Sequence, residues 1–413
     1  MIRSMSSALS GLRNHQAMLD VVGNDIANVS TIGFKGSSTV FSDVLTQTLK
    51  GAAAPGGQIA GTNPAQIGLG SRLAGTVQSF AQGAIQRTSR PTDFAIQGDG
   101  FFVVNNGAEN LYTRAGAFNL DATGNLTTPD GAVVQGWRAD ASGVVDTNAA
   151  IQAVQIRVGD ILPPAQTSSV SLGGNITADA AIGDAVAMSV TAFDSQGGAT
   201  PLNLTFTKSA ADEWTVTGSA GDPAVAVALT DNVLTFDGSG ELVGPAGRNI
   251  NIAGGLIAGI PNAMTVVLGG AAESGRLTQY AGQASAGITE QNGSPAGTLQ
   301  VFNVGQDGVI VGSYSNGLNR EIGQVATAVF TNPGGLERIA GSWRQTANSG
   351  LAQIGIAGGG GRGLMSAGTL EMSNVDLAEE FTRLIVAQRG FQGNARVITT
   401  SDEILQEVVN QKR

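Results

Sequence analysis

The chain has 413 residues, of which 13% are charged, and its formal net charge at pH 7 is −10. An acidic chain lacks the basic patch that nucleic-acid binding normally needs, so we expect no nucleic-acid partner. The absence of cysteine excludes disulfides and thiol catalysis, and a single histidine, His15, excludes multi-histidine metal sites. No run approaches ~18 consecutive apolar residues, so we expect no membrane insertion. The first residues also lack the continuous apolar region of a cleaved signal peptide.

The N-terminal region, residues 1–30, has the pattern of one amphipathic helix. Apolar residues recur every seven positions, which keeps one seam of a helix facing a partner helix. Asn24, Asn28 and Ser30 favour caps and turns, so we expect the helix to end among them. The residues of the predicted seam are Met5, Leu9, Leu12, Leu19 and Ile26.

Residues 31–84 are predicted to be a connecting segment, because residues 51–70 are rich in Gly, Ala and Pro. Short strands then dominate. Residues 94–104 are predicted to form a strand, a turn and a second strand. Asp307-Gly308 is a strong hairpin turn signal between two further predicted strands.

No helical stripe is evident between residues 85 and 365, and many short strands separated by turns are typical of sandwich or barrel domains. We therefore expect a β-rich inner domain from residues 85–148 and 291–369, with a β-rich outer domain at 149–290.

The C-terminal region, residues 370–413, repeats the helical pattern in a single seven-residue register. Ser373 to Asp376 fits a capping box, which predicts a helix starting near residue 374. Gly390 and Gly393 inside this helix each cost roughly 1 kcal/mol relative to alanine. The predicted seam continues through Leu377, Phe381, Leu384, Phe391, Ile398 and Leu405.

These elements predict a mainly β protein with terminal α-helices. The topology is nested: the chain passes from the N-terminal helix through the β domains and comes back, so that its two ends meet. The predicted fold class is thus a nested multidomain protein whose helical ends, 1–30 and 370–413, form a coiled-coil-like core domain; that such a protein is an axial component of an assembly is implied only by the resemblance described below. A single helix with one apolar seam is marginal alone. We therefore expect the two ends to pair with each other, and with neighbouring subunits, only on assembly.

No cluster of residues in the sequence supports catalysis or cofactor binding. Gly98-Asp99-Gly100 lacks the third glycine and the following helix of a phosphate loop, so it is interpreted as a strand turn. Asp121 to Gly124 and Asp307-Gly308 lack the alternating ligands of a calcium loop and are also interpreted as turns. We expect no enzyme activity, no cofactor and no metal.

The stretch from Asn24 to Lys35 resembles the N-terminal signature of the flagellar rod and hook protein family. The C-terminal stretches 373–381, 385–389 and 394–402 are similar to the family's other hallmark, and 98–102 and 113–116 match inner motifs. The departure from the family is Gly390-Phe391-Gln392-Gly393, where Ala-Tyr-Gln-Ala is usual. The matching residues of the N-terminal signature are Asn24, Ile26, Asn28, Thr31, Gly33, Phe34 and Lys35.

The resemblance implies a self-assembling tube, with helices around a channel and β domains outward, that acts as a joint carrying torque from rod to filament. It implies export through the flagellar type III apparatus to an extracellular location. The implied partners are further copies of the chain, the hook cap, the distal rod and the hook–filament junction proteins. The ~140 residues after Trp137 favour a hook member over a distal rod or junction protein. A secreted β-rich adhesin remains the alternative from another class.

Overall fold

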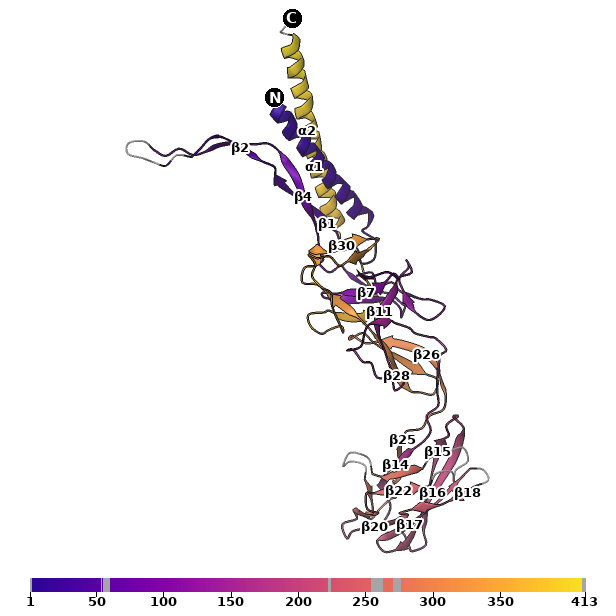
Figure 1. The fold of residues 1–413 in the computed structure, drawn as a ribbon. Helices are drawn as coiled ribbons and strands as arrows, with labels where there is room; N and C mark the ends of the chain where they lie inside the picture. The colour runs from indigo at the N-terminus through magenta and orange to yellow at the C-terminus, as the bar shows by residue number, and fades with distance from the viewer. Residues whose placement is uncertain are drawn as a thin grey trace. The chain divides into compact units, whose positions relative to one another are not determined.

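The computed structural model describes residues 2–52, 54, 60–221, 224–253, 263–269 and 276–410. These residues form two compact units. The first comprises 1–157, 302–311 and 321–413, and the second comprises 158–301 and 312–320. Most of the regular structure is β, with one long helix near each end of the chain (Figure 1). No helix within the described ranges is both long enough and apolar enough to cross a membrane.

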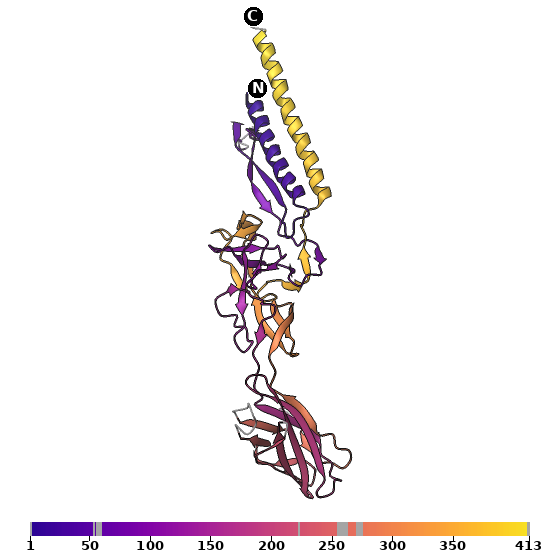
Figure 2. The same cartoon turned by 90° about the vertical axis from the view of Figure 1, so that its right-hand side faces the viewer.

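The two long helices, α1 (Ile2–Ala27) and α2 (Leu377–Asn410), pack side by side and antiparallel in the first unit (Figures 1 and 2). Glycines permit their close approach. A Cβ on Gly11 would lie 2.7 Å from the Asn394 amide nitrogen, and a Cβ on Gly390 would lie 2.4 Å from the His15 ring. The expectation that the ends pair only on assembly therefore differs from the structure, where they pair within one chain.

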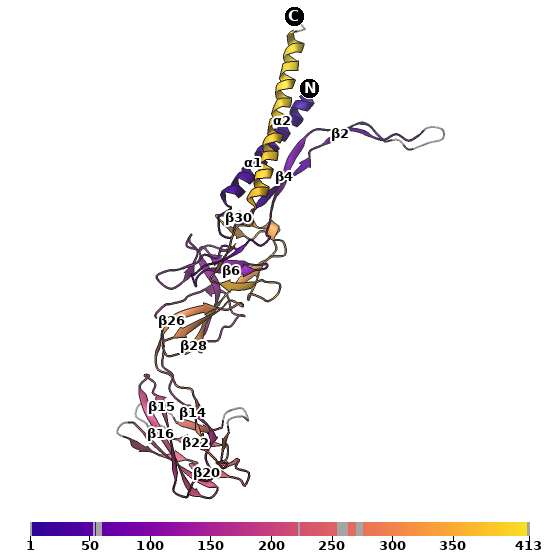
Figure 3. The same cartoon turned by 180° about the vertical axis from the view of Figure 1, so that it is seen from behind.

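The segment predicted to be a connector forms two antiparallel strand pairs, which its composition did not predict. β1 (Ser37–Asp43) pairs with β4 (Ser71–Gln78), and β2 (Thr46–Lys50) pairs with β3 (Ala65–Gly68). The first pair lies against α1, where the Asn14 amide donates to the Ser71 hydroxyl at 2.8 Å. The second pair extends away from α1 (Figure 3).

The β part of the first unit surrounds an aromatic core of Phe101, Tyr112, Trp137, Phe330 and Trp343. The predicted strands at 94–104 are confirmed as β6 and β7. The strands are β5 (Ile85–Arg87), β6 (Phe94–Gln97), β7 (Phe101–Asn105), β8 (Asn110–Thr113), β9 (Asn119–Leu120), β10 (Leu126–Thr127), β11 (Val133–Arg138), β12 (Gln152–Ala153), β29 (Thr327–Val329), β30 (Glu337–Ile339), β31 (Ser342–Arg344), β32 (Gln353–Gly355), β33 (Leu364–Ala367) and β34 (Thr369–Glu371). A 3₁₀ turn, η1, spans Pro333–Gly335.

Three strands contribute residues to both units: β26 (Gly297–Val304), β27 (Val309–Tyr314) and β28 (Asn319–Val325). β26 and β27 are neighbours in the sheet on either side of Asp307-Gly308, which confirms the predicted hairpin. Gly308 has φ of 85°, as this turn requires.

The second unit is a β domain in which buried and exposed side chains alternate along the longest strands, as expected for sheets with one face on a core. Its core includes Leu204, Phe206 and Trp214. Its strands are β13 (Ile161–Leu162), β14 (Ser169–Asn175), β15 (Ala185–Phe193), β16 (Ala199–Ala210), β17 (Glu213–Ala220), β18 (Val225–Val227), β19 (Leu229–Thr230), β20 (Val233–Phe236), β21 (Leu242–Gly244), β22 (Asn249–Ile252), β23 (Met264–Leu268), β24 (Leu277–Thr278) and β25 (Gly287–Gln291).

One turn design recurs in both units. Asp121, Asp140, Asp194 and Asp237 each accept hydrogen bonds through Oδ1 from the backbone amides two and four residues later. At Asp121, the hydrogen bond from the Thr123 hydroxyl and those from Asn125 lower the carboxyl pKa to about 2. The turn expected at 121–124 is thus confirmed, and its carboxylate is occupied by the loop's own donors.

The two α2 glycines are predicted to respond in opposite ways to alanine. Gly390→Ala places a methyl group in the space of the His15 ring, which should destabilise the helix pair by about 1–3 kcal/mol. Gly393 has open space around it, so Gly393→Ala should stabilise α2 by about 1 kcal/mol. Thermal unfolding followed by helical circular dichroism measures both.

A second substitution at the partner position tests the cause of the Gly390 effect. Adding His15→Ala to Gly390→Ala should recover most of the lost stability, because the clashing ring is gone. An equal loss of stability in Gly390→Ala and Gly393→Ala would contradict the close contact.

Candidate functional site

The signature residues after α1 form a tight loop that returns the chain to the β part of the first unit. The Asn28 amide donates to the Asn24 backbone and side-chain oxygens at 2.9 and 3.2 Å, and the Thr31 hydroxyl donates to Asn28 Oδ1 at 3.0 Å. Ile26 is half-buried, as part of the helix. The local hydrogen bonds explain why small polar residues end the helix here.

Gly33 and Phe34 seat this loop on the β part of the first unit. Gly33 has φ of 68°, and a Cβ there would lie 2.5 Å from the Ala115 backbone nitrogen, so a larger residue does not fit. Phe34 is buried beneath the Arg338 guanidinium, whose central carbon lies 4.4 Å from the ring centroid. The loop is therefore fixed by both shape and charge.

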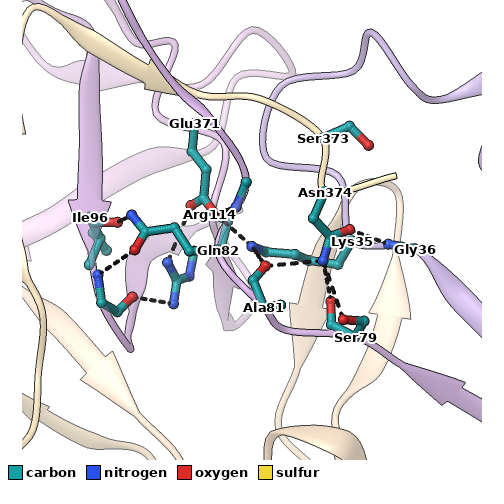
Figure 4. Close-up of polar contacts among 12 residues, drawn as sticks. Lys35, Gly36, Ser79, Ala81, Gln82, Ile96, Arg114, Glu371, Ser373 and Asn374 are labelled. Atoms are coloured by element: carbon teal, nitrogen blue, oxygen red, sulfur yellow. Dashed lines mark hydrogen bonds and ion pairs between the residues drawn. The ribbon is translucent and has the colours of Figure 1, made fainter. Parts of the chain in front are cut away.

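Lys35 reaches into the interior and forms the centre of the site (Figure 4). Its ammonium group is fully buried and donates to Glu371 Oε1 at 2.6 Å and to the Ala81 carbonyl at 2.7 Å. Glu371, also fully buried, accepts from the Gly83 backbone amide at 2.9 Å through the same oxygen. The Glu371 backbone carbonyl accepts from Gly33 at 2.8 Å. One residue of β34 thus joins the N-terminal loop and the segment before β5.

Arg114 is a second cation on the same carboxylate. Its Nη1 lies 3.2 Å from Glu371 Oε2, and its Nη2 donates to the Gly98 carbonyl at 2.8 Å. Burial lowers the pKa of Lys35 and that of Arg114, and in each case the ionic and hydrogen-bond contact with Glu371 opposes that change. Glu371 is therefore the direct ionic partner of both buried cations, and Asp99 adds a weaker attraction at Arg114.

Asn374 ties the start of the C-terminal segment to the same place. Its Oδ1 accepts from the Gly36 amide at 2.9 Å, while its Nδ2 donates to the Ser79 and Ala81 carbonyls at 2.8 and 3.0 Å (Figure 4). Nearby, Gln82 donates to the Ile96 carbonyl at 3.1 Å and accepts from Gly98. Four separate stretches of the chain meet within this network.

The predicted start of the C-terminal helix needs correction, because α2 begins at Leu377 rather than near residue 374. Asp376 caps the helix, with Oδ1 accepting from the Ala378 and Glu379 amides at 2.8 and 3.3 Å. Residues 369–371 belong to β34 instead. Ser373, the cap that the capping box predicted, accepts from the Val375 amide at 3.3 Å, but this contact precedes the helix.

The seam residues lie beside the contact between α1 and α2 rather than at its centre. On α2 the buried residues include Glu380, Ala387 and Ser401, in a row seven residues apart that also contains half-buried Asn394. Large side chains are displaced from this row by the close approach at Gly11 and Gly390. Of the predicted seam, Met5, Leu9, Leu377 and Phe381 are exposed, whereas Leu12, Leu19, Ile26, Leu384, Phe391, Ile398 and Leu405 are half-buried.

Sequence reasoning missed Glu371 and Arg114 as members of the site. A signal for Glu371 exists, since an acidic residue stands in a short strand just before a helix cap. Arg114 lies within a matched motif, but nothing in its sequence context indicates which carboxylate it contacts. Burial of three charged groups in one place is a tertiary property.

Glu371→Gln is predicted to be strongly destabilising, because it removes the carboxylate that is the direct ionic partner of both Lys35 and Arg114. Breaking a buried ion pair in this way costs about 3–5 kcal/mol. Backbone amides of residues 33–37 should exchange with deuterium roughly 100-fold faster or more, as measured by mass spectrometry. Glu379→Gln is the matched control, since Glu379 is 61% exposed in its pair with Arg383 and such pairs contribute about 0–1 kcal/mol. Equal exchange in both variants would show that the network is dispensable.

Comparison with known proteins places these features in a family. Residues 95–178 match the family described as flagellar hook protein FlgE/F/G D1 domain, and residues 175–294 match the flagellar basal body protein FlaE D2 domain. Residues 366–411 match the flagellar basal body rod FlgEFG protein C-terminal family. The last match spans Glu371, Asn374 and α2, and the first spans Arg114.

Solved structures contain a similar fold. The crystal structure of Helicobacter pylori flagellar hook protein FlgE2 aligns with a TM-score of 0.50 at 14% identity, covering 64% of this chain and 94% of that chain. At that identity the likeness establishes the fold alone.

Full-length relatives are more informative. The flagellar hook protein FlgE of Borreliella burgdorferi is 38% identical over 448 residues, and that of Treponema pallidum is 37% identical over 465, with all of each chain covered. The flagellar basal-body rod protein FlgG of Bacillus subtilis is 32% identical over 416 residues, again with full coverage. The length of this chain therefore does not distinguish it from this rod-named relative. The sequence identity is higher to the two hook proteins than to the rod protein. The chain belongs to the flagellar hook protein family.

Proposed function

We propose that this chain is a non-enzymatic structural subunit of the flagellar hook, which polymerises into a curved, hollow tube that transmits torque from rod to filament. The full-length similarity to hook proteins carries this proposal. The helix pair supplies the physical support, because pairing α1 with α2 leaves large apolar side chains in contact with water.

The apolar residues left outside the helix pair occur on both flanks of α2. Phe381 is 51% exposed and Ile385 is 55% exposed on one flank, and Val386 is 56% exposed on another. Exposed apolar side chains in this number favour burial against further copies of the helix. In the proposed polymer they are covered together with the predicted seam, which includes Leu384, Phe391, Ile398 and Leu405.

The domain roles that we propose follow the same arrangement. Residues 1–30 and 370–413 form the helical core, and 31–84 connect it to an inner domain of 85–148 and 291–369. Residues 149–290 form the outer domain. The compact second unit, 158–301 with 312–320, supports an outer domain of nearly this extent.

The proposed partners are the chain itself, the hook cap, the distal rod, the hook–filament junction proteins and the type III export apparatus. The proposed location is the extracellular hook, reached without cleavage of a signal peptide. The Bacillus subtilis relative named for the basal-body rod keeps a rod subunit as the second candidate. Electron micrographs of the polymer distinguish curved tubes from straight rods.

Phe381→Glu is predicted to abolish polymerisation without unfolding the subunit. The side chain is half exposed in the subunit, so the single chain tolerates a carboxylate there. In the polymer an unpaired buried charge costs several kcal/mol, which raises the critical concentration by about 100-fold or more. Sedimentation of the purified chain measures this, with circular dichroism as the check on the fold.

Thr382→Glu is the control, because it adds the same charge one residue later on a different face of the helix, where the side chain is also exposed. It should sediment like the unsubstituted chain. Normal polymerisation of Phe381→Glu would remove α2 from the proposed subunit contacts.

A further inference from the structure

A cavity of about 170 Å³ lies in the first unit, between the loop of residues 31–34 and the hairpin of β30 and β31. Its lining includes the apolar residues Phe34, Pro129 and Trp343. A cavity of roughly 150 Å³ can hold a benzene ring, so this one has room for a side chain of another molecule. Neither Lys35 nor Glu371 lines it, so the cavity is distinct from the buried ion pairs.

Arg338 is the cation in the lining of this cavity. Its guanidinium lies over the Phe34 ring, with 4.4 Å between its central carbon and the ring centroid. The side chain is half-buried, and it makes no hydrogen bond and no ion pair with any residue that the structure describes. A guanidinium carries five N–H donors in a rigid fork that matches the two oxygens of a carboxylate. The contact with Phe34 therefore holds these donors in place at the wall of the cavity.

Two carboxylates influence this cation without forming an ion pair with it in the described part of the chain. Burial lowers the pKa of Arg338, and the charge of Asp25 opposes that change. The Asp25 carboxylate itself accepts from the Ser37 amide at 2.8 Å. Asp130 belongs to the cavity lining and is exposed, so salt and water screen its charge. The cation is thus partly desolvated but lacks a direct anionic partner.

The charge of the chain indicates what the cavity receives. The sequence has 32 acidic residues against 22 lysines and arginines, so each copy of the chain presents more carboxylates than cations. Opposite charges that meet across an interface favour association and fix its register. In the proposed polymer every subunit is surrounded by further copies, and their carboxylates are the anions that stay closest to Arg338.

We propose that Arg338 binds, in this cavity, the carboxylate of an aspartate or glutamate side chain from a second copy of the chain. The inference rests on the proposed polymer, to which it adds a polar contact outside the helices. The apolar walls accommodate the methylene groups of such a side chain, while the guanidinium donates to both carboxylate oxygens.

Titration of the full-length subunit with sodium propionate, which models the glutamate side chain, tests the site below the critical concentration for assembly. Sodium chloride keeps the ionic strength constant. The chain has three tryptophans, and labelling with 5-fluorotryptophan gives each a ¹⁹F resonance. Trp343 is paired directly with Arg338 in the hairpin, so its resonance should shift and saturate while the other two stay unchanged. Trp343→Phe assigns the signal.

Substitutions of the lining should change the propionate affinity in opposite directions. Arg338→Gln should weaken binding by about 10-fold or more, because charge-assisted hydrogen bonds are lost. Arg338→Lys keeps the charge but not the fork, so it should weaken binding by a smaller factor, and it replaces Arg338→Gln if that variant does not fold. Asp130→Asn should strengthen binding by about twofold, because a like charge is removed. Arg87→Gln removes an exposed arginine of β5 and, as the matched control, should leave the titration unchanged.

Sedimentation of the assembled chain tests the occupant. Propionate should raise the critical concentration relative to an equal concentration of chloride, and Arg338→Gln should raise it by about 10-fold. Propionate binding with no change in assembly would identify a site for free anions and overturn the second copy as occupant. Absence of the Trp343 response in a chain that still polymerises would overturn the site itself. A chain that binds propionate yet never polymerises would instead contradict the proposed function, and with it this occupant.

Discussion

The buried ion pairs of Glu371 with Lys35 and Arg114 are the central interaction of the first unit. The Glu371 carboxylate compensates both buried cations and accepts a backbone hydrogen bond from Gly83. The same residue receives Gly33 through its carbonyl. Because these contacts come from stretches far apart in the sequence, removing the carboxylate releases several connections together. The network therefore joins the loop after α1 and the segment before α2 to the β part of the unit.

In the helix pair, small residues form the contact between α1 and α2, and large apolar residues lie outside it. The centre of the contact is made of Ala387, Ser401 and two glycines, while aromatic and branched side chains such as Phe381 and Ile385 stay outside. Small residues allow the helix backbones to approach closely, and they leave the larger side chains free for other contacts. A subunit that must join many copies benefits from this arrangement, since its own folding does not consume the apolar surface that assembly requires.

Much of the fold could be predicted from local patterns. The strands at 94–104, the hairpin at Asp307-Gly308 and the terminal helices were predictable because period and turn chemistry are encoded within a few residues. The hairpins between Ser37 and Gln78 were not, since their strands are short, exposed and interrupted by a Gly-rich stretch. The predicted helix start was too early, because Asp376 rather than Ser373 caps α2.

In the candidate site, the sequence identified single residues but not the residues that they contact. Lys35 and Gly33 stood out through a motif, but their partners Glu371 and Arg114 lie 336 and 81 residues away from them, and no local pattern connects them. The heptad register likewise identified the apolar positions but not which of them face α1. That choice depends on the paired contacts of Gly11 with Asn394 and His15 with Gly390, which only the packed helices create.

The separation between Lys35 and Glu371 also constrains the order in which the molecule can be completed. Closing so long a loop is slow compared with forming local hairpins, so a hairpin such as β7 with β8 can form before β34 pairs with β5 and brings Glu371 to Lys35. A chain that stops short of residue 371 lacks the carboxylate that is the ionic partner of Lys35. The buried ion pair therefore forms only in a chain that extends at least to residue 371. Only such a chain can bury Lys35 with its counter-ion.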